Sequence, residues 1–153
     1  MTLTEELFSL IRAFEQEAID YAVCGGLAMA LHGYARTTQD IDVMMLAEDL
    51  DRAKSVARKA GFGIDAGRMD CGGGQTCIYR LTKLDPEYDD ALPLDIVMVT
   101  NNNRNVWEKR IPIETELGPV WSVTKDGLIH MKKLSGRKQD LADIERLEEE
   151  GNG

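Results

Sequence analysis

The chain has 153 residues, of which 43% are hydrophobic, and a formal net charge of -9. This length and composition predict a soluble protein that buries a core of its own without covalent staples. The negative charge argues against broad, nonspecific binding to duplex nucleic acid, because that binding depends on lysine and arginine side chains that displace counterions. No apolar stretch approaches the roughly 20 residues that span a bilayer, and the acidic N-terminus is unlike a signal peptide, so we expect a cytoplasmic protein that does not enter a membrane.

The first half of the chain predicts three helices and two strands. Thr2 and Glu5 fit a capping box, and the apolar residues that follow, as far as Phe14, recur at helical spacing. The expected elements, in chain order, are this first helix, a short buried strand over 21–24, a helix over 27–33, a central strand over 40–46 and a charged amphipathic helix over 48–60. Residues 61–75 are rich in glycine and are predicted to form a loop.

The second half predicts further strands and then two helices. The expected elements are strands over 76–84 and 92–100, a short helix near 104–110, weaker strands within 111–123 and two terminal helices separated by Gly136. No repeat or linker divides the sequence, so residues 1–153 are expected to form one domain. The order of elements predicts an α/β or α+β fold, in which helices flank a mixed central β-sheet.

Three aspartates lie within strands that are otherwise apolar. Asp40 and Asp42 are two residues apart, so they project from the same face of a strand at a separation of about 6 to 7 Å. Asp95 is the lone charge in a later strand, LPLDIVMV. Because desolvated carboxylates repel one another, these three require strong donors or a divalent cation. Hard carboxylate oxygens suit Mg²⁺, and carboxylate clusters that hold two such ions stabilise displacement at phosphorus.

Gly25 and Gly26 stand between a predicted strand and a predicted helix. Glycine lets the backbone approach a phosphate closely, and a helix start aims amide groups at it. Taken alone, a glycine pair after a strand is most often a plain turn, and a D-x-D sequence is often a surface feature or a structural ion pair. Their occurrence together, with Asp95 added, favours a site for a metal ion and a nucleotide.

A basic segment, residues 125–138, carries five basic residues and one acid, a local charge of +4. Of its side chains, Lys133 and Lys138 are predicted to bind the polyphosphate of a nucleotide, and Lys132 and Arg137 are further candidates. These side chains alternate faces, so only some of them can reach one site. The alternative is that the whole segment is a solvated helix face.

Four other residues each have two interpretations. Arg36 either contacts the triphosphate or pairs with a neighbouring carboxylate, and Thr38 either binds the nucleotide or shapes the loop that enters the strand. Asp140 and Asp143 either orient the bases of the preceding segment or cap the last helix, and the structural role is the favoured one.

The residues in this pattern resemble those of a known superfamily. The arrangement GG...R.T.DIDV is formed here by Gly25, Gly26, Arg36, Thr38 and residues 40–43, and a lone strand aspartate, Asp95, follows later. It resembles the active-site pattern of the DNA polymerase β-type nucleotidyltransferase superfamily. A closer likeness is to small prokaryotic nucleotidyltransferase domains related to the abortive-infection and toxin-antitoxin nucleotidyltransferases, whose closing motif is similar to KKLSGRKQDLADIERL.

The resemblance implies a metal-dependent transfer of a nucleoside monophosphate from an NTP such as ATP to an acceptor hydroxyl, with release of pyrophosphate. It implies two Mg²⁺ or Mn²⁺ ions bridged by Asp40 and Asp42, with Asp95 holding the second ion beside the attacking oxygen. The acceptor stays open between an RNA end such as that of tRNA, a protein and a small molecule, and a cognate protein partner is a further expectation. The alternative function is a regulatory or partner-binding module of the same fold that binds a nucleotide but catalyses weakly.

Overall fold

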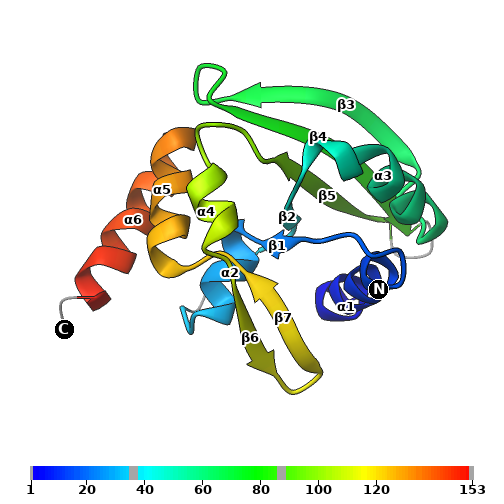
Figure 1. The fold of residues 1–153 in the computed structure, drawn as a ribbon, viewed down its shortest axis with the longest axis horizontal. Coiled ribbons are helices and arrows are strands. Elements are labelled where there is room, and N and C mark those ends of the chain that lie inside the picture. Colours follow the sequence, from blue (N-terminus) through cyan, green and yellow to red (C-terminus); the bar gives the residue numbers. More distant parts are fainter. Residues whose placement is uncertain (1, 35–37, 86–88, 152–153) are drawn as a thin grey trace.

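The computed structural model describes residues 2–34, 38–85 and 89–151, and these fold around one seven-stranded sheet (Figure 1). The elements are α1 (Leu3–Gln16), β1 (Ala22–Val23), α2 (Gly25–Leu31), β2 (Ile41–Met45), a 3-10 turn (Ala47–Asp49), α3 (Leu50–Lys59), β3 (Ile64–Cys71), β4 (Thr76–Asp85), β5 (Asp90–Met98), α4 (Arg104–Glu108), β6 (Ile111–Thr115), β7 (Gly118–Ser122), α5 (Lys125–Ser135) and α6 (Lys138–Gly151).

The sheet is mixed, as the sequence predicts. Its strand order is β3-β4-β5-β2-β1-β7-β6. The pairs β2–β5 and β1–β7 are parallel, whereas the other neighbouring pairs are antiparallel. β2 and β5 lie near the middle of the sheet and are largely buried, which agrees with their nearly continuous apolar sequences.

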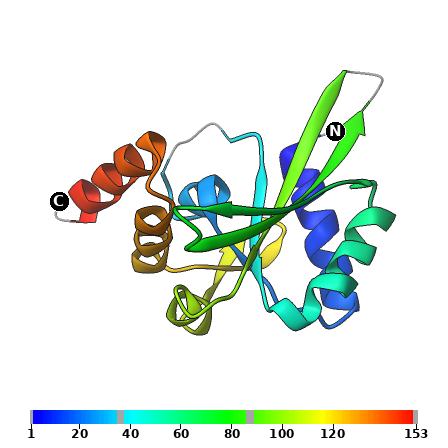
Figure 2. The same cartoon turned by 90° about the horizontal axis from the view of Figure 1, so that it is seen from above.

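The helices flank the sheet in two groups. In both views, α1 and α3 lie together on one side, and α2, α5 and α6 lie on the other (Figures 1 and 2). α1 begins where the sequence predicts, because the Thr2 hydroxyl accepts a hydrogen bond from the Glu5 amide at 3.2 Å. α5 ends at Gly136, which adopts a left-handed backbone conformation with φ of 68°. None of the helices in the described ranges is long and apolar enough to cross a membrane.

The prediction of a loop over 61–75 is wrong. Residues 64–71 form β3, which pairs with β4 in an antiparallel hairpin closed by a turn that contains Gly72, Gly73 and Gly74. β3 is an edge strand with mostly exposed side chains, so its sequence lacks the buried alternation by which strands are recognised. A register shift between Asp65 and Gly67 interrupts the pattern further.

Candidate active site

Three charged side chains form a row across the middle of the sheet. Asp42 on β2 is directly opposite Asp95 on the parallel strand β5, and Asp95 is in turn opposite Arg80 on the antiparallel strand β4. Residues opposite one another on neighbouring strands share a face of the sheet. The strand register therefore brings together two carboxylates that are 53 positions apart in the sequence, and adds an arginine beside them.

A glycine turn lies against one end of this row. The amide of Cys24 donates a hydrogen bond to the Asp42 carbonyl at 3.0 Å, and α2 starts at the next residue. Gly25 has φ of +64°, and a Cβ atom there would overlap the Asp42 carboxylate. Only glycine fits this position without a shift of the backbone or of Asp42.

The row and the turn open into a cleft of about 170 Å³. Its polar wall comes from four places in the chain: the glycine turn, the aspartate-bearing strands, β4, and the junction of α5 with α6. Among the residues that line the cleft are Gly25, Gly26, Thr38, Asp40, Asp42, Arg80, Asp95, Lys132, Arg137 and Asp140. The structure thus gathers the three predicted carboxylates and both predicted glycines around one cavity.

The turn between β3 and β4 closes the cleft from one side. A Cβ at Gly72 would overlap the Leu134 carbonyl at the C-terminal end of α5, so this hairpin packs directly on the helix. Cys71 and Thr76, which flank the turn, line the cleft. The segment that the sequence predicted as a plain loop is therefore part of the cavity wall.

The charged form of Asp42 is disfavoured where it stands. Burial, followed by the negative charges of Asp95 and Asp40, raises the pKa of Asp42 from its ordinary value of 3.8 to about 7, and the positive charges of Arg137 and Lys132 only partly oppose this. The positive charge near Asp42 is therefore too small to balance the negative charges of Asp42, Asp95 and Asp40. A bound cation would supply that charge.

Asp95 already has a counterion, which the sequence analysis missed. Arg80 donates to both oxygens of the Asp95 carboxylate, from Nε at 2.7 Å and from a terminal guanidinium nitrogen at 3.0 Å. This contact, ahead of the charges of Asp95 and Asp40, raises the pKa of Arg80 above its ordinary value. The available signal was that Arg80 is the one charge in the apolar stretch TCIYRLT, but its partner follows only from the register.

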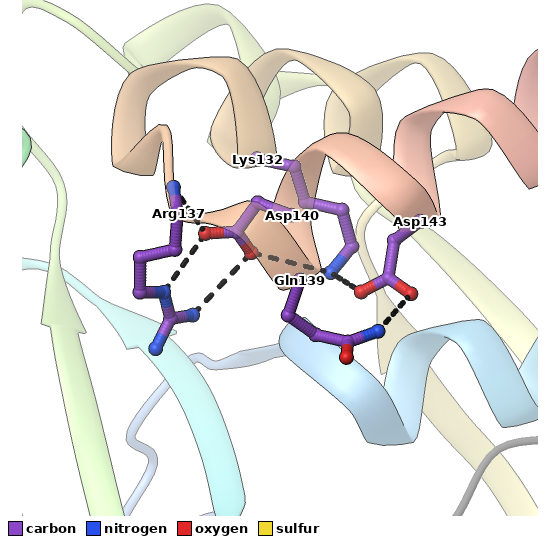
Figure 3. Close-up of polar contacts among 5 residues, drawn as sticks. All are labelled: Lys132, Arg137, Gln139, Asp140 and Asp143. Carbon is purple, nitrogen blue, oxygen red and sulfur yellow. Dashed lines mark hydrogen bonds and ion pairs between the residues drawn. The ribbon is translucent and has the colours of Figure 1, made fainter.

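Of the predicted basic segment, Lys132 and Arg137 reach the cleft, and the network that holds them is drawn in Figure 3. The Lys132 ammonium is buried and lies 2.9 Å from an Asp143 oxygen and 3.7 Å from an Asp140 oxygen. Arg137 Nε donates to Asp140 at 2.8 Å, and Gln139 donates to the other Asp143 oxygen at 3.0 Å. Burial acts to raise the pKa of Asp140, but hydrogen bonding to Arg137 and the nearby charges of Arg137 and Lys132 lower it overall.

Lys133 and Lys138 are not among the residues that line the cleft. The Lys133 side chain is 61% exposed and lies 3.8 Å from Glu148, and Lys138 is also exposed. The structure therefore places the two named lysines outside the cleft. Their neighbours Lys132 and Arg137 line it, Lys132 as a buried side chain and Arg137 as one that is 74% exposed.

Both interpretations of Asp140 hold at once. It accepts hydrogen bonds from the Arg137 side chain and, at 3.2 Å, from the Arg137 backbone amide at the start of α6.

Thr38 lines the cleft, and its hydroxyl also donates to the Asp40 carbonyl at 3.4 Å, just ahead of β2. Arg36 lies outside the described residues.

The donor set suits a hard cation only in part. Asp40 and Asp42 offer carboxylate oxygens to one cleft, and the pKa of Asp42 is that of a carboxylate short of positive charge, which fits Mg²⁺ or Mn²⁺. Both oxygens of Asp95 already accept a hydrogen bond from Arg80, which weakens their contribution to this set. Within the part of the chain that the structure describes, no three histidine, cysteine, aspartate or glutamate side chains are gathered closely enough to hold a metal ion.

Comparison with solved structures identifies the fold. No family model and no curated protein sequence matches the chain. A protein of Thermotoga maritima, TM1012, designated a candidate nucleotidyltransferase, superposes with a TM-score of 0.61 over 98% of this chain and 96% of its own, at 13% identity. The chain has the nucleotidyltransferase fold.

A second structural neighbour supports the same assignment. ANT(2'')-Ia, solved in complex with adenylyl-2''-tobramycin, superposes with a TM-score of 0.67 over 98% of this chain and 90% of its own, also at 13% identity. JHP933 of Helicobacter pylori superposes less closely, with a TM-score of 0.53 over 94% of this chain and 63% of its own. The resemblance to the nucleotidyltransferase superfamily is thus confirmed at the level of the fold, and the narrower likeness to abortive-infection and toxin-antitoxin domains stays a prediction.

Proposed function

We propose that this protein is a nucleotidyltransferase that moves a nucleoside monophosphate from an NTP to an acceptor hydroxyl. The acceptor oxygen attacks the α-phosphorus, the bond from that phosphorus to the bridging oxygen of the β-phosphate breaks, and pyrophosphate leaves with that oxygen. The acceptor proton passes to a carboxylate or to water. The observation that carries the proposal is the direct packing of Gly25 on Asp42, beside Asp95, in a cleft that is also lined by Arg80, Lys132 and Arg137.

Each wall of the cleft has a separate part in this reaction. Gly25 and Gly26 line the cleft and carry no side chain, so the triphosphate would be able to approach the backbone there. Lys132 and Arg137 face the same cavity and offset the charge of the polyphosphate, in place of Lys133 and Lys138. Asp95 lies on the side of Asp42 away from the glycine turn, which suits it to orient the attacking hydroxyl. Catalysis then comes mainly from positioning and charge neutralisation.

Asp40 and Asp42 would hold Mg²⁺ or Mn²⁺, and Asp95 is the third candidate ligand for a second ion. When bound, such ions neutralise charge that develops on the phosphate oxygens. Asp40 and Asp42 also keep the triphosphate from binding without a cation, because two carboxylates and a polyphosphate repel one another.

A second candidate function is a nucleotide-binding regulatory module that pairs with another protein. The observation that favours it is the bidentate Arg80–Asp95 ion pair, which occupies the third carboxylate. Such a module binds NTP and transfers nothing.

The deciding experiment is incubation of the protein with each α-labelled NTP, with Mg²⁺ or Mn²⁺, and with one acceptor class at a time. The acceptor classes are total RNA including tRNA, cell-extract protein, and small-molecule hydroxyl compounds including tobramycin, the last because ANT(2'')-Ia was solved with adenylyl-2''-tobramycin. Label that appears in one class with the protein, and not with its Asp42→Asn variant, supports the transferase and names the acceptor. NTP binding without labelling of any class favours the regulatory module, in which a cognate partner or antitoxin is the next component to seek.

A further inference from the structure

Arg80 occupies the place from which Asp95 would serve a cation. Its guanidinium contacts both Asp95 oxygens, at 2.7 and 3.0 Å, so neither oxygen of that carboxylate is without a donor. The Asp95 side chain is only 7% exposed. The arginine is therefore the main local compensation for a buried negative charge.

The row across the sheet sets Arg80 and a cation in competition. Across β4, β5 and β2 the side chains stand in the order Arg80, Asp95, Asp42. A divalent ion held between Asp42 and Asp95 would therefore lie on the opposite side of Asp95 from the Arg80 guanidinium. A guanidinium and a divalent cation repel each other at such short range. A ligand oxygen that already accepts a charge-assisted hydrogen bond is also a weaker donor to a metal.

Arg80 is free enough to give way, whereas Asp95 is not. The Arg80 side chain is 36% exposed and lines the cleft, so its guanidinium has solvent to move into. Asp95 is on a central strand between β4 and β2 and is held in place by the sheet. If the Arg80–Asp95 ion pair separates, it is therefore the Arg80 side chain that moves and not Asp95.

We propose that Arg80 is a positioning residue that holds the Asp95 carboxylate in the metal-free protein and competes with a divalent cation for it. This inference rests on the proposed function for its biological meaning, but the competition itself is a property of the cleft. A divalent ion at this end of the cleft would therefore be bound more tightly by Asp95 once the guanidinium has moved away from that carboxylate.

The test measures Mn²⁺ binding to the nucleotide-free protein, by the loss of the free-ion signal in electron paramagnetic resonance. Arg80→Gln removes the charge and leaves a polar side chain, and it should bind Mn²⁺ on the order of tenfold more tightly than the unmodified protein, or bind one more ion. Arg80→Lys keeps a charge without the fork geometry and should fall between the two. Adding Asp95→Asn to Arg80→Gln should return the affinity to that of the unmodified protein.

Arg68→Gln is the matched control. Arg68 lies on the neighbouring strand β3, pairs with exposed Asp70 at 3.1 Å and does not line the cleft. Its loss should leave Mn²⁺ binding unchanged. Thermal unfolding adds a second measurement: Arg80→Gln should melt at a lower temperature without metal and gain more from Mn²⁺ than the unmodified protein does.

Equal or weaker Mn²⁺ binding by Arg80→Gln, or no Mn²⁺ binding by either protein, would overturn the competition. If Arg80→Gln does not fold, Arg80→Lys decides the question by the same titration. Tighter Mn²⁺ binding by the variant together with no labelled acceptor in any class would leave the competition standing and reject the transferase function.

Discussion

The Lys132 ammonium on α5 and the Asp143 carboxylate on α6 lie 2.9 Å apart, with side chains that are 6% and 2% exposed. This ion pair joins the two terminal helices at the edge of the cleft and sets the direction in which Lys132 points (Figure 3). A buried pair of this kind is costly to break, because removal of one partner leaves the other charge desolvated and uncompensated.

Asp143→Ala should therefore lower the free energy of unfolding by about 3 kcal/mol or more, measured by urea denaturation. The matched control is Glu148→Ala on the same helix, because the Lys133–Glu148 pair is 3.8 Å long and both of its side chains are more than half exposed. That control should cost at most about 1 kcal/mol. Equal effects of the two substitutions would show that Lys132 does not depend on its buried partner.

Asp42→Asn should abolish nucleotidyl transfer while the protein remains folded. The change removes the charge of a cleft carboxylate and keeps its volume, so the packing against Gly25 is preserved. Circular dichroism checks the fold, and transfer of label from an α-labelled NTP checks the activity. A folded variant that still transfers label would remove Asp42 from the mechanism.

Stability without metal should depend on pH through Asp42. Burial and the nearby carboxylates raise the pKa of Asp42 to about 7, from an ordinary value of 3.8, so the folded state holds a proton that the unfolded state releases between these values. The contribution of Asp42 to stability is thus fully present below about pH 4 and is lost as the pH rises to about 7. Urea unfolding in EDTA should show this decline, and it should be flatter in Asp42→Asn than in the unmodified protein.

Gly25→Ala should both destabilise the protein and weaken NTP binding. Gly25 has φ of +64°, which costs about 1 kcal/mol for alanine, and the added Cβ would overlap the Asp42 carboxylate. Gly33→Ala is the control for the backbone cost alone, because Gly33 has φ of +92° and nothing lies within 4 Å of a Cβ built there. Isothermal titration with NTP and Mg²⁺ should show a loss of affinity for Gly25→Ala only. Normal binding by that variant would mean that the glycine pair is only a turn.

Arg137→Gln should weaken NTP binding by about 1 to 3 kcal/mol, the range of charge-assisted hydrogen bonds. Lys138→Gln is its neighbour in sequence and loses the same charge, but it lies outside the cleft, so its effect should be small. Titration at fixed Mg²⁺ compares the two. A larger effect of Lys138→Gln would restore the assignment made from the sequence alone and suggest an acceptor surface on the outer face of α6.

How much the sequence foretells depends on whether a feature is local. The apolar spacing from Leu7 to Phe14 and the capping box at Thr2 depend only on near neighbours, and α1 lies where they predict it. The same is true of β2, which is recognised by its apolar run, and in any strand Asp42 shares a face with the residues two positions away. The three carboxylates and the glycine pair were found in this way, because each is an exception to a local pattern.

Strand register and helix docking were decided only by the tertiary structure. The sequence does not show that Arg80 is opposite Asp95, because that pairing depends on the register in which β4 and β5 align. β3 was missed because an exposed edge strand has no buried face to mark it. The choice of Lys132 over Lys133 follows from the way α5 packs on α6, since neighbouring side chains on a helix point in different directions and only packing selects which of them face the cleft. Arg137 reaches the cleft from the junction between these two helices, whose place is also set by their packing.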